Sequence, residues 1–92
     1  MDYNYPIRHD WTTAEMITVV AFYEAVEKAY ESGILKEQLM DAYRSFKKVV
    51  PSMAEEKTLD KEFEEVSGYV IYRVIKTAKG AVDGEMIRGV RR

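Results

Sequence analysis

The sequence contains no cysteine, and this absence excludes disulfide bonds, thiolate zinc sites and cysteine nucleophiles. The core must therefore be stabilised by the burial of apolar side chains. Long apolar runs are missing as well, because the longest covers only residues 19–23 and is too short to cross a bilayer. The N-terminal residues show no basic segment followed by an apolar one, which is the pattern of a secretory signal. We therefore expect an untargeted cytoplasmic protein.

Histidine is nearly absent, since His9 is the single one in the chain. Nucleophilic catalysis needs a nucleophile beside a positioned base, and no serine or threonine occurs in a sequence context typical of it. His9 followed by Asp10 has the chemistry of an acid/base pair, but a surface histidine before a helix explains it more simply. We therefore expect no catalytic residues and no enzyme activity.

Acidic residues are regularly spaced in one charged segment. Glu56, Asp60 and Glu64 recur every four residues, so on a helix they would share one face and have the chemistry to gather a hard cation. Lys57 and Lys61 alternate with them, however, as in ordinary ion pairs on a solvent-facing helix. Neither a calcium-binding loop nor a glycine-rich phosphate loop occurs in the sequence. We therefore expect no metal ion and no cofactor.

The chain does contain enough apolar surface for one core. It has 92 residues, 47% of them hydrophobic, and no linker or repeat divides it, so we expect a single domain over residues 1–92. Helix-capping patterns, glycines and prolines separate four segments with apolar stripes, covering residues 13–32, 35–48, 53–66 and 69–79. A strand is the weaker alternative for the last segment. The expected fold class is all-α, a small bundle of about four helices.

The two ends of the chain fall outside the expected helices. Residues 1–11 form an extended N-terminal arm, and residues 80–92 form a basic tail that we expect to be irregular, or else a short helix or hairpin. The arm contains the aromatic residues Tyr3, Tyr5 and Trp11. It either lies across the bundle and caps the core, with its hydroxyl groups at the rim, or presents an aromatic patch to a partner. Tyr72 joins these three residues as a candidate interaction residue.

Charge is divided unevenly along the chain. Residues 1–67 include 8 basic and 14 acidic residues, a net charge of −6, whereas residues 68–92 include 6 basic and 2 acidic residues, a net charge of +4. The basic part either balances the acidic part within the fold or binds an acidic partner. The candidate phosphate contacts are Arg73, Lys76, Lys79, Arg88, Arg91 and Arg92.

The break at Gly68 between two expected helices is typical of a helix-turn-helix, in which Val74 would take a core position on the second helix. Two features disagree with DNA reading. Glu64 stands where a small residue usually packs, and Val70, Ile71 and Tyr72 stand where base-reading polar residues are needed. Nucleic-acid binding is therefore an alternative interpretation.

Several short segments together resemble a known family. They are YNYP at residues 3–6, DWTT at 10–13, EM at 15–16, FY at 22–23, VE at 26–27, AYE at 29–31, YRSFK at 43–47, VPS at 50–52, EEK at 55–57 and SGY at 67–69. With these segments the chain resembles the YktA-like uncharacterised protein family of low-GC Gram-positive bacteria, family 0223. The resemblance implies an α-helical bacterial cytoplasmic protein of unknown function and carries over no activity, ligand or catalytic residue. Residues after Gly80 match nothing firm in the family's pattern.

The sequence thus favours a small non-enzymatic protein-interaction module. Its candidate contacts are Tyr3, Tyr5, Trp11 and Tyr72, and its partner is another protein or a second copy of the chain. The alternative is a nucleic-acid-binding accessory protein that uses the helix-turn-helix-like segment around Gly68. Neither a membrane nor a small-molecule substrate is indicated.

Overall fold

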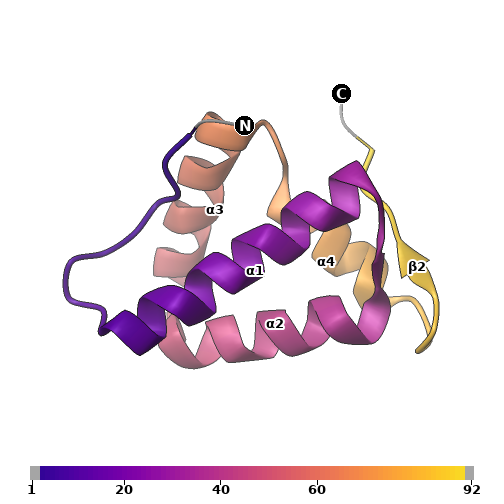
Figure 1. Ribbon diagram of the computed structural model, residues 1–92, viewed down its shortest axis with the longest axis horizontal. Helices are drawn as coiled ribbons and strands as arrows, with labels where there is room; N and C mark the ends of the chain where they lie inside the picture. The colour runs from indigo at the N-terminus through magenta and orange to yellow at the C-terminus, as the bar shows by residue number, and fades with distance from the viewer. Residues whose placement is uncertain (1–2, 91–92) are drawn as a thin grey trace.

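A computed structural model of the chain describes residues 3–90 and shows four helices and two very short strands (Figure 1). The expected all-α bundle is confirmed. The elements are α1 (Thr13–Glu31), β1 (Ile34–Leu35), α2 (Lys36–Val49), α3 (Met53–Ser67), α4 (Ile71–Lys79) and β2 (Met86–Ile87). Within the described residues, no helix is both long and apolar enough to cross a membrane.

The helix boundaries follow local chemistry in the sequence. The Thr12 hydroxyl accepts a hydrogen bond from the Glu15 amide, and the Glu15 side chain accepts one from the Thr12 amide, which completes the capping box that starts α1. The Ser52 hydroxyl caps α3 in the same way by accepting from the Glu55 amide. Gly68 ends α3 with a φ of 80°, a conformation that side chains with a Cβ atom rarely adopt.

The core is a stack of aromatic rings held between the helices. In Figure 1, α1 packs along α2, and α3 and α4 lie behind α1. The rings of Phe22 on α1 and Phe46 on α2 are stacked with their centroids 4.6 Å apart, and the rings of Tyr23 and Phe63 on α3 are stacked at 4.8 Å. All four side chains are fully buried, so this stack joins three helices.

The C-terminal tail departs from the irregular segment that we expected. Its strand β2 pairs antiparallel with β1, with Ile87 opposite Ile34, and Ile87 is only 1% exposed. Residues 34–35, which we assigned partly to the second helix, are therefore a strand. Pairing between segments so distant in the sequence gives no local signal, and two residues are too few to show a strand period. The tail thus contributes to the core.

The tail continues along α1 after β2. The Gly89 amide donates to the Ala29 carbonyl oxygen over 3.0 Å, and a Cβ atom added at Gly89 would lie 2.4 Å from the Tyr30 ring. Only glycine lets the backbone approach the ring this closely. The Tyr30 hydroxyl in turn donates to the Val70 carbonyl oxygen over 2.7 Å. Residues 88–90 are therefore fixed in place beside α4, where they form one wall of a groove.

Candidate functional site

The aromatic residues of the N-terminal arm pack against the core. Tyr3 and Tyr5 are half-buried, and their hydroxyl groups both donate to the Glu27 carboxylate, over 2.7 Å for Tyr5. The Tyr5 ring stacks on Tyr23 at 5.5 Å and on Phe63 at 6.3 Å. Burial raises the pKa of the Glu27 carboxyl group. The arm therefore caps the core with its hydroxyl groups at the rim, as in the first of our two interpretations.

The other two candidate interaction residues lie in opposite environments. Trp11 is 8% exposed and belongs to the buried core, so its ring is not presented to a partner. Tyr72 is 65% exposed in the first turn of α4. The structure thus separates Tyr72 from the aromatic residues of the arm, with which it was grouped from sequence.

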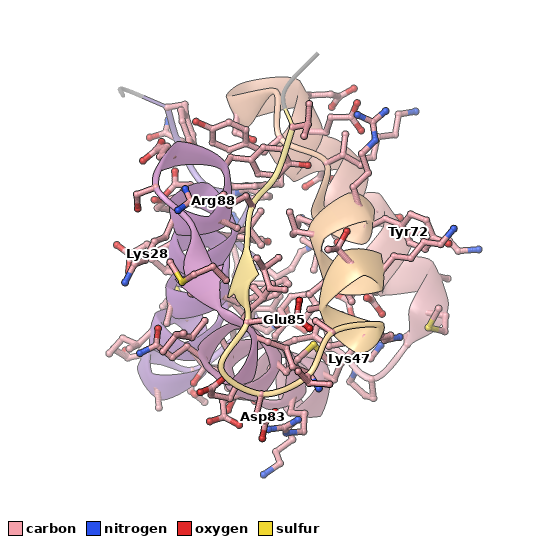
Figure 2. All side chains as sticks on the ribbon, turned by 90° about the vertical axis from the view of Figure 1, so that its right-hand side faces the viewer. Lys28, Lys47, Tyr72, Asp83, Glu85 and Arg88 are labelled. Carbon is pink, nitrogen blue, oxygen red and sulfur yellow. The ribbon has the colours of Figure 1, made fainter. Side chains whose placement is uncertain are left out.

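Tyr72 projects outward because α4 is amphipathic. The residues of α4 that face the core are Ile71, Val74, Ile75 and Ala78, all at most 5% exposed. Figure 2 shows Tyr72 pointing away from the body of the molecule, on the opposite side from Lys28 of α1. Its side chain lines each of three neighbouring hollows, with volumes of about 630, 250 and 290 Å³. Tyr72 is therefore a ridge between concave surfaces.

The first hollow, the apolar cleft, lies between α2, α3 and α4 and has a volume of about 250 Å³. Apolar and aromatic side chains make most of its surface, and three exposed lysines also line it. The lining comprises Tyr43, Met53, Ile71, Tyr72 and Ile75, the lysines Lys57, Lys76 and Lys79, and the carboxylates of Glu56 and Asp60. Met53 is itself 61% exposed, so a second large apolar side chain stands at the cleft.

The carboxylates of the apolar cleft correct one expectation from the sequence. Glu56, which we expected on a solvent-facing helix surface, is 6% exposed and accepts hydrogen bonds from Lys47 Nζ over 2.5 Å and from the Tyr43 hydroxyl over 2.8 Å. Its partners come from α2 and not from the neighbouring lysines of α3. Burial and the hydrogen bond to Glu56 raise the pKa of the Tyr43 hydroxyl. This cluster joins α2 to α3.

Asp60 lies next to this cluster and is half-buried. Burial, together with the negative charge of Glu56, raises the pKa of its carboxyl group to about 7, and the positive charge of Lys47 opposes this rise. Among the described residues, its Oδ1 atom is buried without a hydrogen-bond partner. Asp60 therefore carries a cost when it is ionised, because its charge is neither fully hydrated nor paired.

The second hollow, the tail groove, lies between α4 and residues 88–90 and has a volume of about 630 Å³. It is lined by Tyr72, Arg73, Val74, Lys76, Thr77, Arg88, Gly89 and Val90. No acidic residue lines it among the described part of the chain. Tyr72 and Lys76 line both the tail groove and the apolar cleft, so the two hollows are adjacent across α4.

The candidate phosphate contacts point in different directions. Arg73 and Lys76 line the tail groove, whereas the Lys79 ammonium lies 5.7 Å from the centre of the Tyr43 ring, toward the apolar cleft. The Arg88 guanidinium donates to the Ser32 carbonyl oxygen over 3.0 Å, at the end of α1 (Figure 2). Arg91 and Arg92 lie outside the described residues. Of the described candidates, Arg73, Lys76 and Arg88 therefore line the tail groove together, whereas Lys79 lies apart from them.

The helix-turn-helix interpretation meets a packing constraint at the start of α4. Ile71 is 2% exposed, and the Val70 carbonyl oxygen accepts the hydrogen bond from Tyr30, so the turn after Gly68 is engaged by the core. A recognition helix reads bases with the side chains of its first turns. Here Tyr72 and Arg73 are the exposed side chains of that turn.

Within residues 3–90, no three acidic or histidine side chains are placed to hold a metal ion.

The family relationship follows from comparison with known proteins. The model of the uncharacterised protein family UPF0223 matches residues 2–87. The chain belongs to this family. A UPF0223 protein of Bacillus cytotoxicus is 58% identical over 88 residues, which are 96% of this chain and 99% of the relative.

Two further UPF0223 relatives come from other species. YktA of Bacillus subtilis is 53% identical over 79 residues, 86% of this chain and 90% of the relative, and a Listeria monocytogenes protein is 49% identical over 86 residues, 94% and 96% of the two chains. The resemblance to this bacterial family, which we found on short segments, is thereby confirmed. The match extends to Ile87 and so includes β2, beyond the residue at which the sequence alone showed a resemblance.

Two functional candidates were missed from the sequence alone. Met53 stands directly after the cap of α3, a place with no functional signal of its own. Lys57 belongs to a run of alternating charges, in which every lysine has an acidic neighbour. For the neighbouring α4 the sequence does contain a signal, because its amphipathic pattern places Tyr72 and Lys76 on the solvent side.

Proposed function

We propose that this UPF0223 protein is a small non-enzymatic protein-interaction module whose contact surface is centred on Tyr72. The observation that supports this proposal is the Tyr72 ring, 65% exposed between the apolar cleft and the tail groove. Tyrosine and arginine are enriched among the residues that dominate binding energy at interfaces. Tyr72 and Arg73 supply such side chains, and Met53 adds an exposed apolar one, beside two hollows that a partner can fill. We call this region the Tyr72 surface.

The non-enzymatic part of the proposal is supported by how the polar groups of the cleft are used. A carboxyl group with a pKa of about 7, such as that of Asp60, suits a general base. Its Oδ1 atom is buried, however, and the neighbouring Glu56 is already bound by Lys47 and Tyr43. The Tyr43 hydroxyl in the same cleft donates to Glu56, and its raised pKa keeps it protonated and so weakly nucleophilic. These groups fit a structural role in joining α2 to α3.

A protein partner fits the Tyr72 surface better than a nucleic acid does. Binding to nucleic acid is driven by several cations that follow the phosphate backbone. Among residues 3–90, the cations that line the tail groove are Arg73, Lys76 and Arg88, and the Arg88 guanidinium already donates to the Ser32 carbonyl oxygen. The third hollow beside Tyr72 mixes the carboxylates of Asp60 and Glu64 with Lys57 and Lys61, so the described cations do not form one continuous path across α4.

The proposal is tested by comparing two exposed positions. Ile17 on α1 is also 65% exposed and lines none of the three hollows, so Ile17→Ala is a matched control for Tyr72→Ala. The tagged wild type and both variants are used to capture proteins from a Bacillus subtilis lysate, with and without nuclease, and the captured proteins are quantified by mass spectrometry.

We expect one set of captured proteins to survive nuclease, to be retained by Ile17→Ala and to be lost with Tyr72→Ala. Equal capture by the two variants would contradict a Tyr72-centred interface. Capture that disappears with nuclease would favour nucleic-acid binding instead. Thermal unfolding of each variant confirms that the change acts on binding and not on folding, since both side chains are mostly exposed.

A further inference from the structure

The size and lining of the apolar cleft suit the side chain of a partner better than a whole small molecule. Its volume of about 250 Å³ lies below the roughly 300–1,000 Å³ that is usual for small-molecule sites. Ile71 and Ile75 of α4 supply apolar surface within it, and the exposed Met53 and Tyr72 stand beside it. Methionine adapts its shape to an incoming group, and tyrosine offers a rigid flat face. One aromatic or long aliphatic side chain would fill such a cleft.

The lysines of the cleft are not paired within the chain. Lys57, Lys76 and Lys79 are exposed, and none of the ion pairs among the described residues includes them. By contrast, Lys47 is engaged by the buried Glu56. Three ammonium groups therefore line the apolar cleft, and they outnumber Asp60, which is the one carboxylate of its lining that Lys47 does not pair with.

Two of these ammonium groups are held near aromatic rings. Lys76 Nζ lies 5.9 Å from the centre of the Tyr72 ring, and Lys79 Nζ lies 5.7 Å from the centre of the Tyr43 ring. A cation over a ring is favoured there but keeps its N–H donors for other acceptors. The positions of these charges are thus partly fixed before a partner binds, which lowers the entropy lost on binding.

From these observations we infer that the Tyr72 surface binds an acidic protein segment, which inserts one apolar side chain into the apolar cleft and places carboxylates against Lys57, Lys76 and Lys79. The inference rests on the proposed function and names the chemistry of its partner. Tyr72 and Lys76 line the tail groove as well, so the segment continues across α4 toward Arg73, where no acidic residue lines the groove. Glu56 does not oppose this binding because Lys47 neutralises it, and the single charge of Asp60 is outnumbered by the three lysines.

The test uses defined probes and needs no known partner. A displayed library of short random peptides is selected on the full-length chain, and the enriched peptides are synthesised and titrated by fluorescence polarisation at low and physiological salt. The test variant combines Lys57→Glu, Lys76→Glu and Lys79→Glu. The control variant carries Lys28→Glu and Lys48→Glu, which change exposed lysines that line none of the hollows. Circular dichroism and thermal unfolding confirm that both variants fold.

We expect the enriched peptides to be rich in Asp and Glu around one Phe, Trp, Leu or Met residue. Their affinity for the wild type should fall with salt, should fall by about tenfold or more in the test variant, and should change by less than about twofold in the control variant. Tyr72→Ala should weaken the same peptides, because the ring forms one side of the cleft.

Several results would overturn the inference. These are selection of basic or uncharged peptides, no enrichment at all, or equal weakening by the test and control variants.

Two other occupants of the surface are measured in parallel. Tighter binding of a single-stranded oligothymidine than of the peptides would assign the lysines to nucleic acid, and dimerisation that the test variant abolishes would assign the surface to a second copy. Tyr72-dependent capture from lysate without acidic peptides would leave the proposed function standing and refute only the acidic partner.

Discussion

Replacing Asp60 by Asn should stabilise the protein, and by an amount that depends on pH. The carboxyl group of Asp60 is half-buried, and within the described residues its Oδ1 atom accepts no hydrogen bond. The charged and polar groups around it come from all four helices. They are Tyr23 on α1, Tyr43 and Lys47 on α2, Glu56, Lys57, Lys61 and Glu64 on α3, and the α4 residues Tyr72, Lys76 and Lys79. Of these, Glu56 opposes its ionisation and Lys47 favours it.

The sign of the effect follows from the two pKa values of Asp60. The carboxyl group has a pKa of about 7 in the folded protein and an ordinary value of 3.8, so the folded state holds its proton more tightly than the unfolded state. The stability that this tighter proton binding contributes to the folded state is complete below pH 3.8 and is lost as pH rises through about 7. Above about pH 7 the ionised group therefore costs stability in full, and the Asn variant does not carry this cost.

The magnitude follows from the same difference. A pKa difference of this size corresponds to about 4 kcal/mol in the free energy of unfolding. Part of the carboxyl group remains in contact with water, which screens the charge, so we expect about half of this, about 2 kcal/mol. The stability of Asp60→Asn minus that of the wild type should therefore rise by about 2 kcal/mol between about pH 4 and about pH 8.

Urea unfolding followed by the fluorescence of the buried Trp11 measures this difference at both pH values. Asp10→Asn is the control, because Asp10 is exposed and lies outside the cleft. A constant difference for Asp60→Asn, or one that falls as pH rises, would refute the assignment of a buried, poorly compensated carboxyl group at this position.

Two matched pairs of substitutions test the packing of the tail by urea unfolding. Gly89→Ala places a Cβ atom 2.4 Å from the Tyr30 ring and should lower the free energy of unfolding by about 1–3 kcal/mol, whereas Gly80→Ala has room and should change it by less than about 1 kcal/mol. Ile87→Ala removes a side chain that is 1% exposed and should cost about 2–4 kcal/mol, whereas Met86→Ala, at 47% exposed, should stay within about 0.5 kcal/mol. Equal effects within either pair would show that the tail is not anchored as described.

The helices could be predicted from sequence because their signals are local. The capping box at Thr12 and Glu15 and the cap at Ser52 act over a few residues, and Gly68 ends α3 by its own conformation. The strand pair could not be predicted, because Ile34 and Ile87 meet only when the whole chain has folded. The tail was therefore expected to be irregular, or else a short helix or hairpin, and its pairing with residues 34–35 was not predicted.

The candidate site was predictable only in part. Tyr72 was identified as a candidate because it is aromatic, and the amphipathic pattern of α4 places it on the solvent side. The arm residue Trp11 has the same chemistry, yet tertiary packing buries it. The ion pair of Lys47 with Glu56 joins two helices across the turn at Pro51, so the pattern of charges within α3 alone did not indicate it. Only the packed structure distinguishes these environments.

Site-specific photocrosslinking in growing cells tests the central claim most directly. The photoreactive aromatic residue benzoylphenylalanine is placed at position 72 in one strain and at position 17 in another, two positions that are equally exposed in the wild type. An interface centred on Tyr72 predicts a discrete protein adduct from position 72 that is absent from position 17 and unaffected by nuclease. Adducts of equal yield from both positions, or none from position 72, would contradict it.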